Sequence, residues 1–297
     1  MVMAKWMLLV VAVMLDALIE YPNLAHPTVW IGKIIIYIDE KYKRKNNVYD
    51  LIAGSLSVLM AYAVAGLTGF LICKTLVFGI LGIILYIYFL KSTFSVGLLI
   101  KKVYSCSVDN EYVLRKNVSE IVSRNVNIEK QYLYSAAIES GAENLVDSII
   151  SPLFYYIIFG LPGAMIYRAI NTADNLIGYN NEKYKRFGKI AALVDYVANY
   201  IPARLFLLIE FLIYGRGIKK DLKIKKGLRI NGKYPMLLFA KILNLRLVKK
   251  GSYVLGSGRL PNADDVKKAT FYLILVSYVF IFIMIIISYV FSLPRWC

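Results

Sequence analysis

An uncharged stretch, LIAGSLSVLMAYAVAGLTGFLIC, occupies residues 51–73 and decides the class of this protein. A membrane-spanning helix needs about 20 predominantly apolar residues, and this stretch is long enough to cross a bilayer. A second uncharged stretch, residues 271–293, is rich in Ile, Phe and Tyr. Because only helices and closed barrels satisfy their backbone hydrogen bonds in lipid, the two stretches predict a helical membrane protein.

Further apolar segments flank these two spans. Residues 75–90 follow the first span after a single charge, Lys74, and predict the second arm of a tight helical hairpin. Residues 1–19 predict a retained first helix, because no small-residue cleavage site of a signal peptide follows them. The chain is therefore predicted to be an all-α, polytopic membrane protein with about four to six membrane-embedded helices.

Two more apolar segments are interrupted. Residues 149–167 contain two prolines and two glycines, and residues 191–214 contain three charged side chains. Broken helices at membrane depth are tolerated only where they are buried in protein or line a cavity. Two full spans, a re-entrant pair and interfacial helices are the alternatives. We favour half-inserted helices, because a pair of full spans would place the basic residues of segment 183–189 outside the cell.

The composition agrees with a membrane protein. Hydrophobic residues make up 59% of the 297 residues, against roughly 45–50% in soluble domains, which excludes a disordered chain and argues against a soluble enzyme. The net charge of +17 comes from 36 Lys and Arg against 19 Asp and Glu, and the basic residues gather in loops beside apolar segments. The positive-inside rule places these loops in the cytoplasm. Topology and anionic lipids explain the charge without nucleic acid.

These features predict a single membrane-embedded domain over residues 1–297, in a multi-pass protein of the cell membrane. Its segments are N-terminal transmembrane helices (1–100), a region with an acidic helix face and the active site (101–215), a basic cytoplasmic loop (216–268) and a C-terminal transmembrane helix (269–297). We make no prediction of the oligomeric state.

Acidic residues gather in the stretch AAIESGAENLVDSIISP at residues 136–152, with Asn144 among them. Glu139, Glu143 and Asp147 follow one another at intervals of four, which places them on one face of a helix. Like charges at this spacing destabilise a helix by about 0.2–0.5 kcal/mol per pair. A cation relieves the repulsion, and Mg²⁺ suits one or two carboxylates together with substrate phosphates. The alternative is a solvated acidic face that pairs with nearby Lys and Arg.

A second polar stretch, YRAINTADNLIGYNNEKYKRFG, covers residues 167–188. Asn171 and Asp174 are spaced i, i+3 and form a second candidate pair for a metal or a phosphate. Arg168 carries a planar guanidinium that can clamp a carboxylate or phosphate. Tyr179, in the loop where the helix is expected to end, is a further candidate for substrate binding. The alternative for this stretch is a helix end with its caps.

Three more ionisable residues lie within or beside apolar segments. Asp195 and Arg204 are candidates for substrate binding, because charged residues at membrane depth usually line a functional cavity. Mutual pairing, together with Asn199, is the structural alternative. His26 follows the first helix and precedes a proline, and it is the only histidine, which excludes a multi-histidine metal site. We expect it to present an imidazole near the interface, with a structural role as the alternative.

Together these stretches resemble the CobD/CbiB family, the adenosylcobinamide-phosphate synthases of cobalamin biosynthesis. The resemblance is carried by IESGAENLVDSIISPLF, FGLPGAMIYRAINTADNLIGYNNEKYKRFG and DYVANYIPAR, with the last of these at residues 195–204. The opening EYPNLAHPTVWIG and the later segments RINGKYPM and LVKKGSYVLGSGRLPNADD extend it, in order, over nearly the whole chain. One departure is SEIVSRNV at residues 119–126, where Asn125 stands at a position at which the family often has Asp.

The resemblance implies an amide-forming ligase. The carboxylate of adenosylcobyric acid would be joined to the amine of (R)-1-amino-2-propanol, or of its O-phosphate, to give adenosylcobinamide or its phosphate. This condensation is uphill in water, so ATP is the expected co-substrate and Mg²⁺ the expected cofactor. Arg168 and Arg204 would hold a carboxylate or phosphate, and the general base would be His26, Glu139 or Glu143.

The resemblance and the spacing together predict one active site. We expect the acidic stretch to face the second polar stretch across it, that is Glu139, Glu143, Asn144 and Asp147 opposite Asn171 and Asp174. Glu139, Glu143 and Asp147 are the expected ligands of Mg²⁺.

Two other classes of protein are alternatives. Membrane transferases of the Asp-rich type also hold Mg²⁺-diphosphate between helices, but their signatures are missing and Asn171 with Asp174 is only a partial match. A transporter would form a midplane site from the broken segments. We find no internal repeat in the sequence, which disfavours a transporter.

Overall fold

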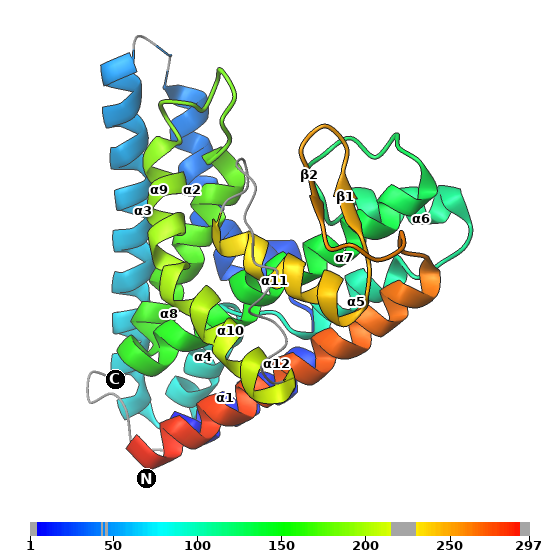
Figure 1. Cartoon of the computed structure of the whole chain (residues 1–297). Coiled ribbons are helices and arrows are strands. Elements are labelled where there is room, and N and C mark those ends of the chain that lie inside the picture. The colour runs from blue at the N-terminus through cyan, green and yellow to red at the C-terminus, as the bar shows by residue number, and fades with distance from the viewer. Residues whose placement is uncertain (1–4, 43, 45–46, 215–229, 292–297) are drawn as a thin grey trace. The chain divides into compact units, whose positions relative to one another are not determined.

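The computed structural model describes residues 5–42, 44, 47–214 and 230–291, and most of these are helical (Figure 1). The prediction of an all-α membrane protein is confirmed. The elements in chain order are α1 (Lys5–Leu18), η1 (Asn23–Ala25), α2 (Pro27–Lys41), α3 (Asn47–Thr75), η2 (Leu76–Phe78), α4 (Ile80–Lys91), α5 (Gly97–Ser105), α6 (Glu111–Ser119), α7 (Lys130–Leu145), η3 (Val146–Ile150), α8 (Ser151–Ile177), α9 (Lys189–Ala198), α10 (Tyr200–Tyr214), α11 (Ile230–Ile242), β1 (Leu247–Lys249), β2 (Tyr253–Leu255) and α12 (Ala263–Phe291).

Four of the described helical stretches are long and apolar enough to cross a membrane: Val48–Phe78, Lys130–Ile177, Lys189–Leu208 and Ala263–Val290. The hairpin predicted after Lys74 is present, because α3 ends at Thr75 and α4 packs back against it. α4 is apolar but only 12 residues long. At 1.5 Å per residue it covers about 18 Å of a hydrocarbon core of roughly 30 Å, so this arm is shorter than a full span.

The chain divides into two units whose segments alternate along the sequence. The first unit takes residues 1–95, 151–199 and 281–297, and the second takes residues 96–150 and 200–280. Each unit therefore combines segments that lie far apart in the sequence, and the four segments set out above stay a prediction.

In the first unit, α3 packs against α2, α4, α8 and α9 (Figure 1). A Cβ atom at Gly69 of α3 would lie 2.7 Å from the Cα atom of Pro162, so glycine is what lets α3 approach the backbone of α8. α8 is broken at Gly160, whose φ of 67° and ψ of −159° are not helical. Pro162 adds to the break because it lacks an N–H group. The interruption predicted for residues 149–167 is confirmed as this kink.

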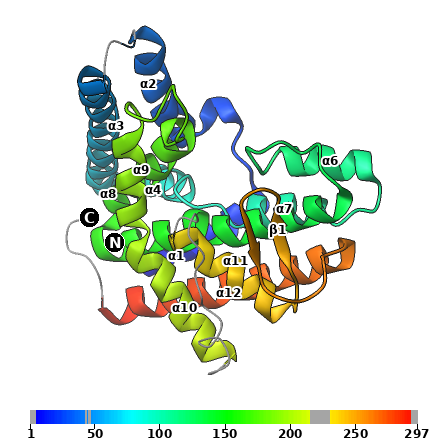
Figure 2. The same ribbon diagram turned by 45° about the horizontal axis from the view of Figure 1, so that its top comes forward.

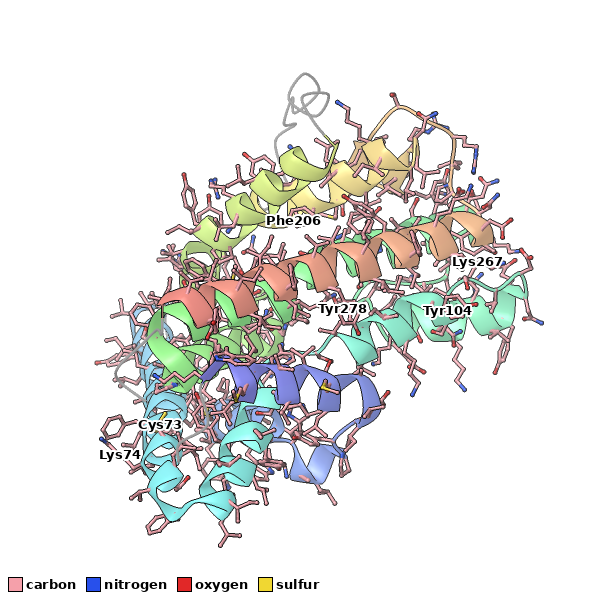
Figure 3. The ribbon with its side chains drawn as sticks, turned by 90° about the horizontal axis from the view of Figure 1, so that it is seen from below. Cys73, Lys74, Tyr104, Phe206, Lys267 and Tyr278 are labelled. Carbon is pink, nitrogen blue, oxygen red and sulfur yellow. The ribbon has the colours of Figure 1, made fainter. Side chains whose placement is uncertain are left out.

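In the second unit, α7 is the central helix, and α5, α6, α11 and β1 pack around it (Figure 2). β1 and β2 form an antiparallel hairpin in which Leu247 lies opposite Leu255. Gly251, with a φ of 73°, adopts the left-handed backbone conformation in the turn between the strands. Tyr104, near the end of α5, and Lys267, in the first turns of α12, lie at the same end of this unit (Figure 3).

Candidate active site

A buried carboxylate lies at the centre of the second unit. Glu139 of α7 is only 3% exposed. Its Oε2 atom accepts hydrogen bonds from Arg124 Nη2 at 2.9 Å and from the Tyr253 hydroxyl at 3.1 Å. Its Oε1 atom is buried and has no hydrogen-bond partner among the described residues. We call Arg124, Glu139 and Tyr253 the Glu139 cluster.

The Oε1 atom of Glu139 is buried and has no hydrogen-bond donor among the described residues, which is energetically costly. An ionised carboxylate is costly to bury unless it is paired and its lone pairs are satisfied. Arg124 supplies the charge partner, but one oxygen of Glu139 has no donor among the described side chains. Such an exception in a folded protein needs an explanation, and a ligand that donates an N–H group is one that fits.

The β-hairpin positions Tyr253 for this contact. Burial raises the pKa of Tyr253 above its ordinary value of 10, and the negative charge of Glu139 acts in the same direction. The phenol therefore stays protonated, and its O–H group donates a hydrogen bond to the carboxylate. Glu143 also raises the pKa of Tyr253, which places a second acid in the neighbourhood of the Glu139 cluster.

The other predicted residues of the acidic stretch are more accessible. Glu143 is exposed and Asp147 is half-buried. A Cβ atom on Gly232 would lie 2.8 Å from Glu143 Oε1, so α11 approaches this carboxylate closely. Asn144 donates from Nδ2 to the Ser140 carbonyl oxygen at 2.9 Å.

The helix changes character within the acidic stretch. α7 ends at Leu145, and Asp147 belongs to the π-helical η3. The spacing of 3.6 residues per turn, on which the shared face rests, therefore applies to Glu139 and Glu143 but not beyond Leu145. Across the described residues, no three His, Cys, Asp or Glu side chains are close enough to hold a metal ion. A magnesium site here would need oxygen ligands from a substrate, and it stays a prediction.

Arg204 lies in the same unit but is engaged by its own neighbours. Its Nη1 atom donates to the Tyr200 carbonyl oxygen at 2.6 Å and to Asn231 Oδ1 at 3.3 Å. Its guanidinium lies 3.3 Å from the centre of the Tyr200 ring. These contacts hold the side chain in place, and a role in substrate binding stays a prediction.

In the first unit, the predicted pair on α8 lies beside Arg168. Arg168 Nη1 is 3.4 Å from Asn171 Oδ1, and Asn175 Nδ2 donates to the same oxygen at 3.3 Å. Asp174 lies near the helix end, where a Cβ atom on Gly178 would meet its Oδ1 atom at 2.0 Å. These residues and the acidic stretch belong to different units. The expectation that they face one another across the site therefore stays a prediction.

Asp195 and Asn199 of the first unit bear out part of the structural alternative, since they pair with each other. Asn199 Nδ2 donates to Asp195 Oδ1 at 3.2 Å, and Asn199 Oδ1 accepts from Tyr167 at 2.8 Å and from Ser151 at 2.5 Å. Tyr179, the remaining candidate, is 42% exposed in the loop after α8.

His26 caps the first turn of α2. Its Nδ1 atom accepts a hydrogen bond from the backbone N–H of Thr28 at 3.3 Å. Burial lowers the pKa of His26 to about 4, and the positive charges of Arg168 and Lys91 add to the shift. The imidazole is therefore neutral at physiological pH.

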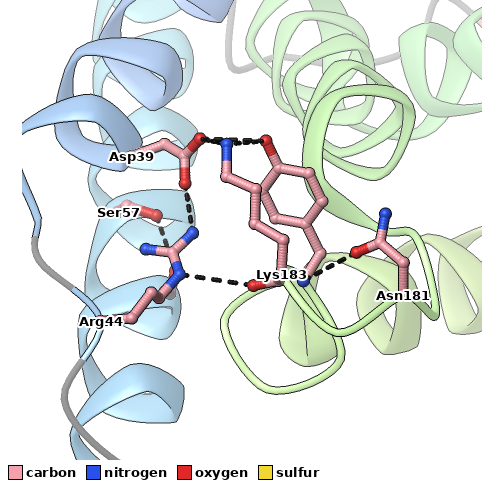
Figure 4. A network of polar contacts seen from close by, with 7 residues as sticks. Asp39, Arg44, Ser57, Asn181 and Lys183 are labelled. Carbon is pink, nitrogen blue, oxygen red and sulfur yellow. Dashed lines mark hydrogen bonds and ion pairs between the residues drawn. The ribbon is translucent and has the colours of Figure 1, made fainter.

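A network around Asp39 is the other polar centre of the first unit (Figure 4). Asp39 Oδ1 accepts from Arg44, and Oδ2 accepts from Lys183 Nζ at 2.8 Å and from the Tyr184 hydroxyl at 3.0 Å. Burial alone would raise the pKa of Asp39, but these donors outweigh burial and lower it. The guanidinium of Arg44 also lies 3.9 Å from the Phe187 ring centre. The network fastens the loop after α8 to the end of α2.

The sequence alone did not point to Arg124, Tyr253 and Lys91. Arg124 lies in the segment that departs from the family pattern, and Tyr253 lies in the C-terminal segment that carries part of the resemblance. Lys91 is a single charge in an otherwise apolar run, which is the one signal that points to a buried role.

Known proteins resemble this chain over most of its length. The family model described as "CobD/Cbib protein" matches residues 9–289. A protein of Pyrococcus furiosus named "Probable cobalamin biosynthesis protein CobD" is 38% identical over 94% of this chain and 98% of its own length. Proteins with the same name from Methanocaldococcus jannaschii and Pyrococcus abyssi are 39% and 40% identical, each over 88% of this chain, and cover 90% and 89% of their own lengths. No solved structure matches the chain.

Proposed function

The chain belongs to the CobD/CbiB family and acts in cobalamin biosynthesis, and we propose that it joins the carboxylate of adenosylcobyric acid to an aminopropanol as an amide. The amine substrate is (R)-1-amino-2-propanol or its O-phosphate. The resemblance in the polar stretches and the buried Glu139 cluster support this proposal.

The reaction makes three demands on the protein. A carboxylate must be activated as a mixed anhydride, for which ATP with Mg²⁺ is the proposed source, so that one oxygen of the acid leaves within inorganic phosphate or a nucleoside monophosphate. The amine nitrogen then attacks the carbonyl carbon, the C–N bond forms and the activated C–O bond breaks. The nitrogen must lose a proton in this step, so a general base within hydrogen-bond reach of the amine is needed.

The observation that carries the proposal is the open Oε1 atom of Glu139. Arg124 and Tyr253 hold Oε2 and fix the orientation of the carboxylate, while Oε1 is buried without a donor from the described chain. An amine N–H group would supply the missing donor and deliver its proton to Oε1. This choice favours Glu139 over Glu143, which is exposed.

The residues also fit a magnesium ion that arrives with a phosphate. Mg²⁺ prefers oxygen ligands and usually keeps only one or two carboxylates of the protein. Glu143 is exposed and Asp147 is half-buried, so both carboxylates are accessible to an ion that arrives with the substrate. We therefore propose Glu143 and Asp147 as the residues that would hold Mg²⁺, which when bound would screen the charge of the substrate phosphates.

The test is a synthesis assay with the purified full-length chain in lipid. Adenosylcobyric acid, the aminopropanol with or without phosphate, ATP and Mg²⁺ are supplied, and the corrinoid product is measured by mass spectrometry. We expect the amide only when all components are present, and its loss in Glu139→Gln. The matched control is Glu129→Gln, since Glu129 is an exposed acid paired with Lys250 at 2.7 Å.

Two outcomes would contradict the proposal. If the wild-type chain forms no amide from intact substrates, the amide-forming activity is wrong. If Glu139→Gln forms as much amide as Glu129→Gln, the activity stands but Glu139 is not its base.

A further inference from the structure

The segment that carries His26 is fixed to the end of α4. Thr28 Oγ1 donates to the Ser92 carbonyl oxygen at 3.1 Å, and the Tyr21 hydroxyl donates to the Tyr88 carbonyl oxygen at 3.3 Å. The Tyr88 hydroxyl in turn donates to the carbonyl oxygen of Ala25. These contacts lie on both sides of His26 in the sequence, so they hold its imidazole in a defined position.

The cap on α2 determines which ring nitrogen of His26 carries the proton. A neutral imidazole has one N–H donor and one acceptor nitrogen. Since Nδ1 accepts from the Thr28 N–H, the proton is on Nε2. Nε2–H has no acceptor among the described residues, and His26 is only partly buried. Because the pKa of about 4 keeps the ring neutral, Nε2–H is a donor at physiological pH and cannot act as a base.

Lys91 lies close enough to His26 for its positive charge to act on the imidazole. It is 5% exposed, and its Nζ atom is 3.6 Å from Asp16 Oδ1. The ammonium also lies 3.9 Å from the centre of the Tyr21 ring, whose edge contacts His26 with 5.8 Å between ring centres. Asp16 balances the charge of Lys91, and the tyrosine holds the ammonium near the imidazole.

Arg168 reaches the same place from α8. α2 packs on α8, where a Cβ atom at Gly32 would contact Thr172 and Leu176. Thr28 lies one helical turn before Gly32 on α2, and Arg168 lies one helical turn before Thr172 on α8. The positive charge of Arg168 accordingly acts on His26. Tyr21, Tyr88, Asp16, Lys91 and Arg168 are thus ionisable groups in the neighbourhood of the imidazole.

We propose that His26, Lys91 and Arg168 form a subsite for an oxyanion of the substrate, with His26 Nε2–H as a neutral hydrogen-bond donor and with Lys91 and Arg168 as the neighbouring positive charges. Lys91 is a positioning residue, because its Nζ atom lies 3.6 Å from Asp16 Oδ1, which holds the ammonium in place. The proposal rests on the proposed function for the identity of the substrate. Two groups have the required chemistry, the carboxylate of the corrinoid acid and the phosphate of a phosphorylated aminopropanol.

Two variants of His26 separate the donor from the helix cap. Asn is a favoured N-cap residue, so His26→Asn keeps the function of Nδ1 but lacks a donor at the distance of Nε2. Gln is longer, and its amide nitrogen reaches the position of Nε2, so His26→Gln keeps the donor but loses the cap. Both are compared with wild type by circular dichroism to establish that they fold.

The first readout is binding of inorganic phosphate to the full-length chain in nanodiscs, followed by ³¹P NMR line broadening. It requires no turnover, so it is independent of the proposed function. We expect His26→Asn to weaken phosphate binding by about 10- to 100-fold, the value of one hydrogen bond to a charged group, and His26→Gln to restore most of it. An equal affinity of wild type and His26→Asn would overturn the subsite.

The second readout is the KM of each substrate in the amide assay. A KM that rises in His26→Asn for the phosphorylated amine alone assigns the subsite to the phosphate, and one that rises for the corrinoid acid alone assigns it to the carboxylate. Impairment of His26→Gln with normal His26→Asn would show that His26 only caps α2. If the wild type forms no amide but its phosphate binding still depends on His26, the proposed function fails and the subsite stands.

Discussion

Asp39 and Glu139 are both buried carboxylates, one in each unit, and they differ in how their oxygens are used. Both oxygens of Asp39 accept hydrogen bonds, one from Arg44 and the other from Lys183 and Tyr184. Only one oxygen of Glu139 does so among the described residues. A carboxylate whose lone pairs are filled by its own chain fastens the fold, and one that keeps a buried oxygen open is suited to a ligand.

The first way to test this comparison is to remove one arginine from each carboxylate. Arg124→Met leaves Glu139 buried with only Tyr253 as a donor, and we expect a loss of about 3–5 kcal/mol of stability, the cost of breaking a buried pair. Arg44→Met leaves Asp39 with Lys183 and Tyr184, so the loss should be smaller. Thermal unfolding in detergent measures both, with Arg124→Lys as the control that keeps the charge. Equal losses at the two sites would refute the difference.

Tyr253→Phe tests whether Glu139 must be held in one orientation. The phenol donates to Oε2, so its loss frees the carboxylate to rotate while leaving Oε1 and Arg124 in place. We expect kcat of amide formation to fall by about 10- to 100-fold, as for one hydrogen bond to a charged group, with little change in KM. Tyr132→Phe is a control, because Tyr132 lies beside Lys250 on the outside of this unit. A raised KM with normal kcat would make Tyr253 a substrate contact instead.

The two carboxylates also show what a sequence can reveal. The acids at intervals of four predicted an α-helix over the acidic stretch, and α7 confirms it as far as Leu145. The partners of Glu139 were not predictable, because Tyr253 lies 114 residues further along the chain and pairing over that distance leaves no local pattern. The network of Asp39 was missed for the same reason, since Lys183 lies 144 residues away. Asp147 was predicted to share a helix face with Glu139 and Glu143 from the α-helical spacing of 3.6 residues per turn, but it lies in the π-helical η3, which has a different spacing.

Asp39→Asn should affect stability and not chemistry. The substitution removes the charge that Arg44 and Lys183 share, but the Lys183 side chain is 57% exposed and solvent screens its contribution. We therefore expect a loss of only about 1 kcal/mol, with kcat per folded molecule unchanged. The measurement is thermal unfolding together with the amide assay. A fall in kcat of folded Asp39→Asn would contradict the division between a fastening and a reacting carboxylate.

His26 extends the comparison to an imidazole in which Nδ1 accepts a hydrogen bond and Nε2–H has no acceptor among the described residues. Its titration predicts how the stability of the fold changes with pH. Its pKa falls from the ordinary 6.5 to about 4 in the folded chain, mainly through burial. Between these values the unfolded chain binds a proton that the folded chain does not, so the free energy of unfolding decreases as the pH falls from 6.5 toward 4. Because His26 is the only histidine, His26→Asn removes this part of the slope. Melting temperatures in detergent at about pH 7 and pH 5 should therefore differ more in the wild type than in His26→Asn. Equal differences would mean that the imidazole takes up a proton in the folded chain, and Nδ1 could then no longer accept from Thr28.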